Sequence, residues 1–253
     1  MNMCGARYLP GLRSAVSRLR FLIVVSVALT LASPSTSADC VVLLHGLART
    51  ANSMQVLKKA FMDRGYKVVN VDYPSREYSV EKLADLAMES GLTACHAEAG
   101  EKVHFVTHSI GGILVRYYLA HHDIPALGRV VMLAPPNQGS ELVDNLSKIP
   151  GFKLINGPAG GQLGKGPNGI PSELGAVDYP VGVIAGTRSV NPILSLYLPD
   201  PDDGKVSVES TKVAGMTDFV TVPASHTFII CNKAAIRQAI AFIETGLFEH
   251  VLP

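Results

Sequence analysis

The sequence lacks an excess of charge of either sign, because its 253 residues include 22 Lys and Arg against 21 Asp and Glu. A chain so close to neutral has no broad basic surface for nucleic acid, and we expect no nucleic-acid partner. The sequence also lacks an internal repeat and any cysteine spacing typical of a zinc site. It therefore predicts one ordinary globular domain, long enough to bury a full hydrophobic core.

The apolar run 21–32 is well short of the roughly 20 residues that a stable transmembrane helix needs. Residues 1–38 contain four arginines before this run, small residues after it, and no acidic side chain. This order is typical of a secretory signal. We expect residues 1–38 to be removed and residues 39–253 to be exported to the periplasm or the medium. An uncleaved N-terminal anchor is the alternative.

Removal of that segment would leave few cysteines, namely Cys40, Cys95 and Cys231. At most one disulfide can then form within the chain. Cys40 opens the first expected strand and Cys95 closes a helical segment, which in a parallel layout places both at the same edge of a sheet. We therefore predict a Cys40–Cys95 disulfide, with buried unpaired thiols as the alternative.

Short apolar runs alternate with amphipathic segments along the rest of the chain. Such alternation predicts right-handed crossovers and a parallel sheet between helical layers. The expected strands are 41–44, 66–71, 103–107, 129–133, 181–186 and 219–222. The expected helices begin at Asn52 or Ser53, at Ser79, at Ile110 and at Asn232, and the last of them ends at Gly246.

The segment 139–180 interrupts this alternation, because it is rich in glycine and proline and has little periodicity. So long an excursion in a compact domain is usually functional or mobile. We interpret it as a lid or cap over a site, with an ordinary surface loop as the alternative.

Ser109 stands between an apolar strand and an amphipathic helix, in the run His108-Ser109-Ile110-Gly111-Gly112. A serine on such a tight turn is exposed beside a helix N-terminus, which favours developing negative charge. Ser109 is therefore the candidate nucleophile.

A serine hydroxyl needs a base and a group that orients this base. In this layout the acid and then the histidine follow the serine along the chain. His226 fits the base, because it follows the last strand, whereas His250 is in the terminal tail. Asp203 precedes Gly204, which allows a sharp turn, and is the preferred acid. Its rivals are Asp200, Asp202 and Asp218, and the cluster 200–203 also offers weak evidence for a structural calcium ion.

Backbone N–H groups are needed where charge forms on the substrate oxygen. Ile110, directly after the serine, supplies one, and Leu47, after His45-Gly46, is the candidate for the second. We expect His45 and His108 to pack and to bond with the backbone, and neither to ligate a metal.

Four motifs in this order resemble the α/β-hydrolase superfamily, and within it small secreted bacterial lipases and esterases: VVLLHG at 41–46, HSIGG at 108–112, Asp203-Gly204 and His226. The resemblance covers nearly all of the exported chain. It implies the α/β-hydrolase fold in a minimal version, with about six mostly parallel strands between helical layers and a lid-like insertion. One departure is Thr107, which replaces the usual first glycine of the G-x-S-x-G motif.

The resemblance also implies roles for individual residues. Ser109, Asp203 and His226 would be catalytic, and Leu47 and Ile110 would form the oxyanion hole. The supporting motif residues are His45, Gly46, His108 and Gly111. No organic cofactor is implied.

These features predict a serine hydrolase that cleaves a small-molecule or lipid ester, with transient contact at a lipid interface. The apolar residues Leu47, Ile110, Leu142, Ile149, Phe152, Leu154 and Ile155 would suit an acyl chain. An acyltransferase, thioesterase or amidase with the same triad is the alternative, and a binding protein that kept the fold is a further one.

Overall fold

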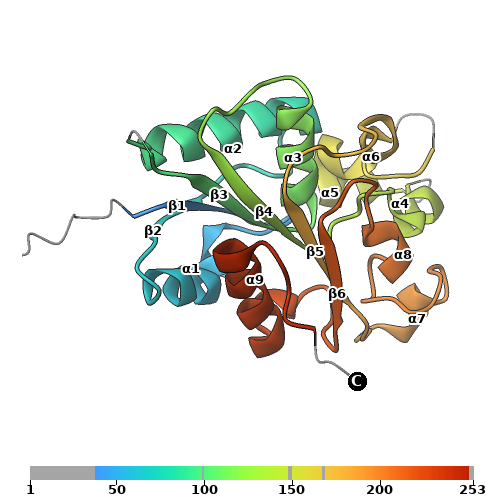
Figure 1. The fold of residues 1–253 in the computed structure, drawn as a ribbon. Coiled ribbons are helices and arrows are strands. Elements are labelled where there is room, and N and C mark those ends of the chain that lie inside the picture. The colour runs from blue at the N-terminus through green and yellow to red at the C-terminus, as the bar shows by residue number, and fades with distance from the viewer. Residues whose placement is uncertain (1–37, 99, 148–149, 167–168, 251–253) are drawn as a thin grey trace, which may run out of the picture. The chain divides into compact units, whose positions relative to one another are not determined.

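The computed structural model describes residues 38–98, 100–147, 150–166 and 169–250, so the predicted signal segment falls outside it except for Ala38. Its strands form one sheet of order β2-β1-β3-β4-β5-β6, and every neighbouring pair is parallel (Figure 1). The strands are β1 (Cys40–Leu44), β2 (Lys67–Val71), β3 (Val103–His108), β4 (Leu127–Leu133), β5 (Val181–Gly186) and β6 (Asp218–Val222). The predicted sheet is confirmed, although β4 begins two residues earlier than expected.

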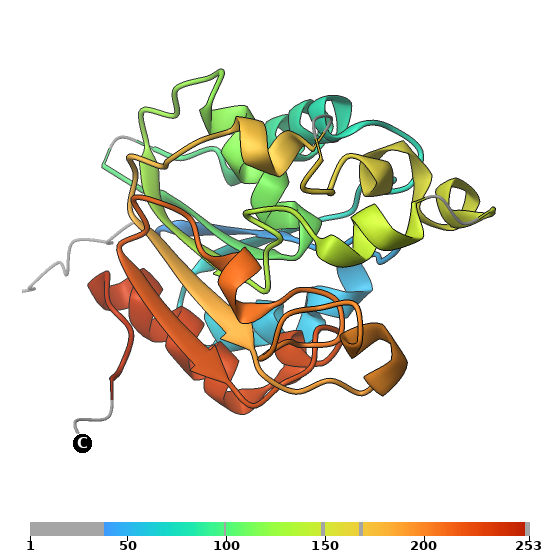
Figure 2. The same cartoon turned by 90° about the vertical axis from the view of Figure 1, so that its right-hand side faces the viewer.

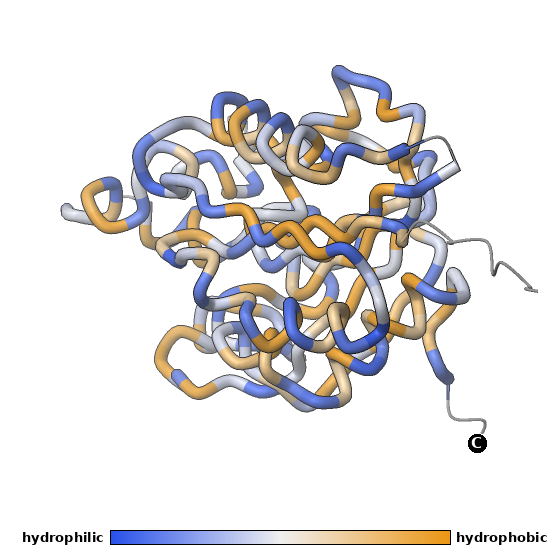
Figure 3. The backbone as a smooth tube through the Cα atoms, turned by 90° about the vertical axis from the view of Figure 1, so that its left-hand side faces the viewer, coloured by the Kyte–Doolittle hydropathy of each residue, from blue (hydrophilic) through white to orange (hydrophobic). Residues whose placement is uncertain are grey.

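Two pairs of helices cover the two faces of the sheet. Helices α2 (Val80–Cys95) and α3 (Ile110–Leu119) lie on one face, and α1 (Gln55–Met62) and α9 (Lys233–Thr245) on the other (Figure 1). Alternate residues of one strand enter different cores, since successive side chains point to opposite faces. Both faces of the central strands are buried, and hydrophobic residues gather in the middle of the molecule (Figure 3).

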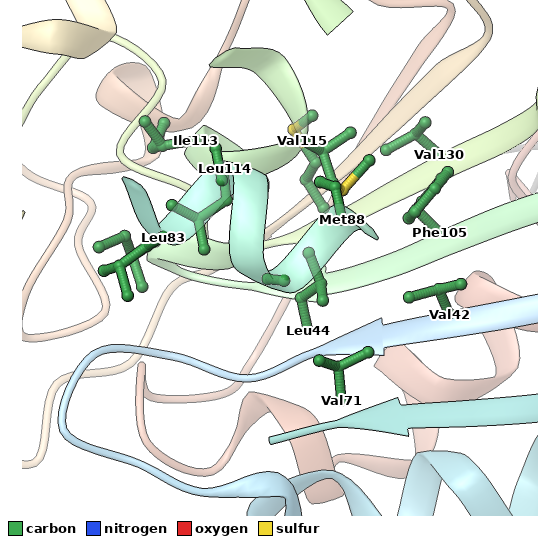
Figure 4. Close-up of a cluster of buried hydrophobic side chains, with 14 of the residues drawn as sticks. Val42, Leu44, Val71, Leu83, Met88, Phe105, Ile113, Leu114, Val115 and Val130 are labelled. Atoms are coloured by element: carbon green, nitrogen blue, oxygen red, sulfur yellow. The ribbon is translucent and has the colours of Figure 1, made fainter. Parts of the chain in front are cut away.

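The core beneath α2 and α3 is built mainly from large aliphatic side chains, which pack around Phe105 (Figure 4). Leu83 and Met88 of α2 and Leu114 of α3 face Leu44 of β1 and Phe105 of β3, and all five are fully buried. Burial of a side chain of this size stabilises the fold by about 1.5–3 kcal/mol. This packing holds the β3–α3 junction, and with it Ser109, against the centre of the sheet.

The ends of the first and last helices are formed differently. Asn232 caps α9 through its side chain, and Gly246 ends this helix in a left-handed conformation, as predicted. The first helical segment instead begins with a 3-10 turn, η1 (Ala51–Met54), and neither Asn52 nor Ser53 is its cap. Its Ala51 N–H donates to the Asp72 carboxylate beyond β2. The first N–H of this turn is thus satisfied by a distant side chain, whereas we expected capping by a local one.

The described part of the segment 139–180 forms three short helices, α4 (Glu141–Leu146), α5 (Phe152–Gly161) and α6 (Ile170–Glu173). A non-helical Gly157 followed by Pro158 kinks α5, which explains why the sequence showed little periodicity. Together with α7 (Pro192–Ser195) and α8 (Val208–Thr211), these helices gather at the carboxyl ends of the strands (Figures 1 and 2). A second 3-10 turn, η2 (Ile229–Cys231), precedes α9.

The opposite, amino-terminal edge of the sheet carries the predicted disulfide. Cys40 at the start of β1 and Cys95 at the end of α2 are bonded, with their Cα atoms 5.9 Å apart, and both are fully buried. Cys231, on η2, is exposed and free. Among the helices of the described ranges, none combines the length and the apolarity needed to cross a membrane.

Candidate active site

Ser109 lies at the junction of β3 and α3 in a backbone conformation that is rare for a residue with a side chain. Its φ is 55° and its ψ is −122°. The turn is held because the Ser109 N–H donates to the Leu133 carbonyl at 2.9 Å and the Gly112 N–H donates to the Ser109 carbonyl at 3.0 Å. Strain of this kind persists only where the surroundings enforce it, and it is found preferentially at functional sites.

The turn is tight because neighbouring backbone passes close to it. A Cβ atom at Gly111 would lie 2.8 Å from the Leu44 carbonyl oxygen, and one at Gly46 would lie 2.7 Å from Nδ1 of His108. Thr107 is accommodated in place of the usual glycine, since it is fully buried and its hydroxyl donates to the Val131 carbonyl at 3.3 Å. Gly46 and Gly111 therefore allow the neighbouring segments to pack closely against the turn.

The structure brings together the three side chains expected to be catalytic. His226 Nε2 lies 3.0 Å from Ser109 Oγ, and His226 Nδ1 lies 2.8 Å from Asp203 Oδ2. The residues come from loops after β3, β5 and β6, and they are 8%, 1% and 6% exposed for Ser109, Asp203 and His226. With Nδ1–H donating to the carboxylate, Nε2 is free to accept the serine proton.

The neighbouring aspartates make other bonds. Asp203 Oδ1 accepts the N–H groups of Lys205 and Val206, which aims the other carboxylate oxygen at His226. Asp202 instead accepts from the Ser195 hydroxyl and the Gly204 N–H. No group of three or more acidic, histidine or cysteine side chains in the described ranges is arranged to hold a metal. Asp202 Oδ1 and both oxygens of Asp203 accept from protein donors.

Asp200 and Asp218 lie away from His226. Asp200 is exposed, while Asp218 at the start of β6 accepts from the Phe248 N–H and contacts His250. These bonds lower the pKa of Asp218 although partial burial opposes them. Asp218 therefore belongs to the packing of the C-terminal segment, at the end of the sheet far from the serine.

Two further histidines support the site through their bonds. His108 Nε2 donates to the His226 carbonyl at 2.9 Å, and burial holds the pKa of His108 well below its usual range. His45 stacks on Tyr73 with ring centres 4.0 Å apart, and its Nδ1 donates to the Gly46 carbonyl. Burial lowers the pKa of His45 as well. Both rings are neutral near pH 7 and are bonded to the backbone, as expected.

The two expected oxyanion donors flank the serine. Ile110 is the first residue of α3, and Leu47 follows the β1 strand. Neither backbone N–H donates to another group of the described residues. Two unused N–H groups, one of them at a helix N-terminus, are suited to a developing negative charge.

A cavity of about 360 Å³ opens beside Ser109 and His226. Most of its wall is apolar and comes from the segment 139–180. Of the residues expected to suit an acyl chain, Leu47, Leu142, Phe152 and Ile155 line it. Leu154 is 86% exposed and Ile110 is buried in the core. Ile149 lies outside the described residues.

The sequence model of the alpha/beta hydrolase family matches residues 41–233, which include all of these site residues. The chain belongs to this family. No curated protein matches the sequence. Solved structures resemble this hydrolase in fold, and among them is the mature Bacillus licheniformis lipase BlEst2. It is 19% identical with a TM-score of 0.63, over 84% of this chain and 94% of that one.

An esterase and a lipase from other sources share the fold. The metagenomic carboxyl esterase MGS0156 is 18% identical with a TM-score of 0.60, over 77% of this chain and 66% of that one. Aspergillus fumigatus lipase B is 14% identical with a TM-score of 0.58, over 82% of this chain and 52% of that one. Identities this low establish the common fold of these hydrolases and nothing finer.

Sequence reasoning missed three cations of this hydrolase. Arg49 and Lys205 line the cavity, and each follows a site residue by two positions, which was the available signal. Arg116 of α3 is 3% exposed and donates to the Asn137 and Gly175 carbonyls at 2.8 and 2.7 Å. It ties both ends of the segment 139–180 to α3. Nothing in its sequence neighbourhood indicates this role.

Proposed function

We propose that this chain is a serine hydrolase of carboxylic esters. His226 Nε2 takes the proton of Ser109 as Oγ attacks the ester carbon, and then gives this proton to the departing alcohol oxygen. Water, deprotonated by the same nitrogen, next cleaves the acyl-serine and releases the acid. Asp203 accepts from Nδ1–H and stabilises the imidazolium during both steps.

The observation that supports this mechanism best is the unbroken hydrogen-bond chain Asp203–His226–Ser109, with contacts of 2.8 and 3.0 Å. The strained serine turn and the free N–H groups of Leu47 and Ile110 add to it. Preorganised donors of this kind are typically worth about 3–4 kcal/mol each in transition-state stabilisation.

The apolar cavity favours an ester with a hydrocarbon acyl part, and we propose that the segment 139–180 acts as its lid. Large apolar side chains of α5 and α7 are exposed beside the cavity: Leu154, Ile155 and Ile193. Exposed apolar groups next to a site are suited to contact with a lipid surface. A lipid ester that is met transiently at an interface is therefore included in the proposed substrate class.

We also propose that the protein is exported. The buried Cys40–Cys95 disulfide supports this, because disulfides persist in oxidising compartments. Periplasm and medium both satisfy the condition. Mass spectrometry of the N-terminus after expression in a bacterial host tests the proposal, and a chain that retains residues 1–38 in the cytoplasm contradicts it.

A fluorophosphonate probe followed by peptide mapping tests the mechanism. Ser109 is expected to be labelled, and Ser109→Ala is expected to lower kcat for p-nitrophenyl esters by at least about 10⁴-fold. Ser225→Ala is the matched control, since Ser225 is a buried serine next to His226 whose hydroxyl has no partner among the described residues. Unchanged turnover in Ser109→Ala would rule the mechanism out.

The substrate class needs a second measurement. Esters of increasing acyl length, amides and thioesters of matched acyl groups, and transfer to added alcohols are compared by kcat/KM. Esters of medium-length acyl chains with water as acceptor are expected to be preferred. Faster cleavage of the thioesters or amides, or dominant transfer to alcohol, would assign the same triad to a different reaction.

A further inference from the structure

Arg49 and Lys205 are the only side chains with a full charge among the described residues that line the cavity beside Ser109. The rest of this wall is apolar or neutral. The chain as a whole is close to neutral, so an excess of basic residues does not explain why both charged residues of this wall are cations. We therefore looked for a role of the two cations in substrate binding at this cavity.

Neither cation has an acidic partner within 4 Å in the part of the chain that the structure describes. Asp203 is the acidic side chain of the site, and its oxygens already accept from His226 and from two backbone N–H groups. The Arg49 guanidinium donates only to the Thr227 hydroxyl, at 3.4 Å. Neither positive charge is therefore neutralised by an ion pair with another described residue.

The two cations line the same cavity as His108 and His226. Removal from water and, next, the Arg49 guanidinium lower the pKa of the Lys205 ammonium, while Asp203 opposes the shift. After burial and His226, the charges of Lys205 and Arg49 also lower the pKa of His108, beneath the turn. Like charges in this proximity repel, and a bound anion would relieve the repulsion.

Both cations are held on the His226 side of the site. Lys205 N–H donates to Asp203, and its carbonyl accepts from the Ser140 hydroxyl at 3.0 Å. Arg49 contacts Thr227, the residue after His226. In the proposed mechanism, His226 gives its proton to the departing oxygen, so the alcohol part of an ester lies on this side. The apolar wall of the segment 139–180 is left for the acyl chain.

We infer that Arg49 and Lys205 form a subsite for an anionic group on the alcohol part of the ester, either a carboxylate or a phosphate. This inference rests on the proposed function. It narrows the substrate class to esters whose leaving alcohol carries an anionic group. The two residues determine specificity by attracting this group, and neither takes part in proton transfer.

The test compares hexanoate esters that differ in the charge of the leaving phenol. The phenols are 4-hydroxybenzoate, 4-hydroxyphenyl phosphate, the neutral methyl 4-hydroxybenzoate and the cationic 4-hydroxyphenyl-trimethylammonium. The readout is the ratio of kcat/KM for an anionic ester to that for the neutral one. General damage to the site lowers both rates and cancels in this ratio.

In Arg49→Gln/Lys205→Gln the ratio is expected to fall about tenfold, roughly threefold for each partly exposed charge contact. The cationic ester is expected to gain relative to the neutral one. Arg49→Lys/Lys205→Arg keeps both charges and is expected to retain most of the ratio. Lys82→Gln/Lys233→Gln removes the same net charge from exposed positions outside the cavity and serves as the matched control.

Salt provides a second arm, because exposed charges are screened over about 10 Å at 0.1 M ionic strength. The anionic preference of the unsubstituted enzyme is expected to shrink between about 0.02 M and about 0.5 M salt. A ratio that stays within about twofold of the unsubstituted value in the double variant at low salt overturns the inference. An equal change in the pH profile for all esters would also overturn it, since the cations would then act on the imidazole.

Calorimetry on Ser109→Ala separates this inference from the proposed function, because it needs no turnover. Octyl phosphate, octanoate and octanol are titrated below their micelle concentrations into Ser109→Ala with and without the two glutamine substitutions. Tighter binding of an octyl anion than of octanol, lost with the cations, supports the subsite even if no ester is cleaved. Equal affinities contradict it while leaving ester hydrolysis untouched. The two anions distinguish phosphate from carboxylate.

Discussion

The two ends of the parallel sheet make opposite demands on the chain. At the amino-terminal end, β1 and α2 start or finish in buried apolar packing and are joined by the Cys40–Cys95 disulfide. At the carboxyl end, Ser109 is strained, Asp203 and His226 are buried polar groups, and two cations without an ion pair among the described residues line the cavity. The features at the amino-terminal end stabilise the fold. Those at the carboxyl end cost stability, and the rest of the fold must offset this cost.

The sharpest test of this contrast uses two neighbouring aspartates in the carboxyl-end loop. Asp203→Asn is expected to lower kcat about 10⁴-fold, because the amide no longer holds the imidazole with Nε2 free to accept a proton. The free energy of unfolding should change little by comparison. Steady-state kinetics and urea unfolding of the same preparation measure both quantities.

Asp202→Asn is the matched control for that substitution. Asp202 is also buried, but its Oδ1 accepts from the Ser195 hydroxyl and the Gly204 N–H, so this substitution changes a carboxylate that does not contact the imidazole of His226. The asparagine oxygen can accept from the same two donors as a weaker, neutral acceptor, so we expect a loss of stability of about 1 kcal/mol and a far smaller fall in kcat. If both asparagine variants lose kcat equally, the assignment of the acid to Asp203 is wrong.

At the opposite end, Cys40→Ala/Cys95→Ala is expected to lower the free energy of unfolding by about 4 kcal/mol, because the bond closes a loop of 55 residues in the unfolded chain. Ester turnover by the folded protein should persist, since the bond lies at the edge of the sheet away from Ser109. Denaturant titration and kcat at the same temperature measure these effects. Cys231→Ala, which removes the exposed free thiol, should change neither.

Arg116 and Arg129 allow a comparison of buried cations at the two ends. Arg116→Met leaves the carbonyls of Asn137 and Gly175 without a donor, and we expect a loss of about 3 kcal/mol. KM should rise more than kcat falls, because the freed segment 139–180 lines the cavity. Chain cleavage by a protease should move to this segment.

Arg129→Met is the control for Arg116→Met. Arg129, at the start of β4, donates to the Ile243 carbonyl at the end of α9, remote from the cavity. It is only half-buried, so we expect a smaller loss of stability and an unchanged KM. A rise in KM for Arg129→Met but not for Arg116→Met would contradict the role given to Arg116.

The same contrast decides what the sequence could predict. Strand β5 was predicted to its exact bounds, because a strand buried on both faces is a continuous apolar run. The ends of α9 followed from Asn232 and Gly246, which act within one turn. Ser109 and His226 could be proposed because Ser109 stands directly after β3, His226 lies in the loop after β6, and their order along the chain is restrictive. Asp203 could be proposed because Gly204 follows it.

What could not be predicted depends on contacts between distant segments. The cap of η1 comes from Asp72, across a whole strand, and no local pattern encodes it. The helices of 139–180 are short and broken at Gly157, so their packing against the sheet replaces periodicity as the cause of their structure. The contacts of Arg116 and the position of Lys205 in the cavity wall depend on segments that only the fold brings together.

The smallest predicted effect is on the pH dependence of stability. Burial lowers the pKa of His108 at the carboxyl end, and of His104 at the amino end. Below the unfolded value of about 6.5, the unfolded chain binds a proton that the native histidine refuses, so the free energy of unfolding falls as the pH falls. Each such histidine contributes up to about 1.4 kcal/mol per pH unit.

His108→Gln and His104→Gln should each remove part of this acid sensitivity, as measured by urea unfolding between about pH 7.5 and pH 5. Asp39, 3.3 Å from His104, opposes the shift at the amino end, whereas the pKa of His108 lies well below its usual range. The slope removed by His108→Gln should therefore extend to lower pH than that removed by His104→Gln. Identical slopes would mean that the carboxyl end is no costlier to protonate than the amino end.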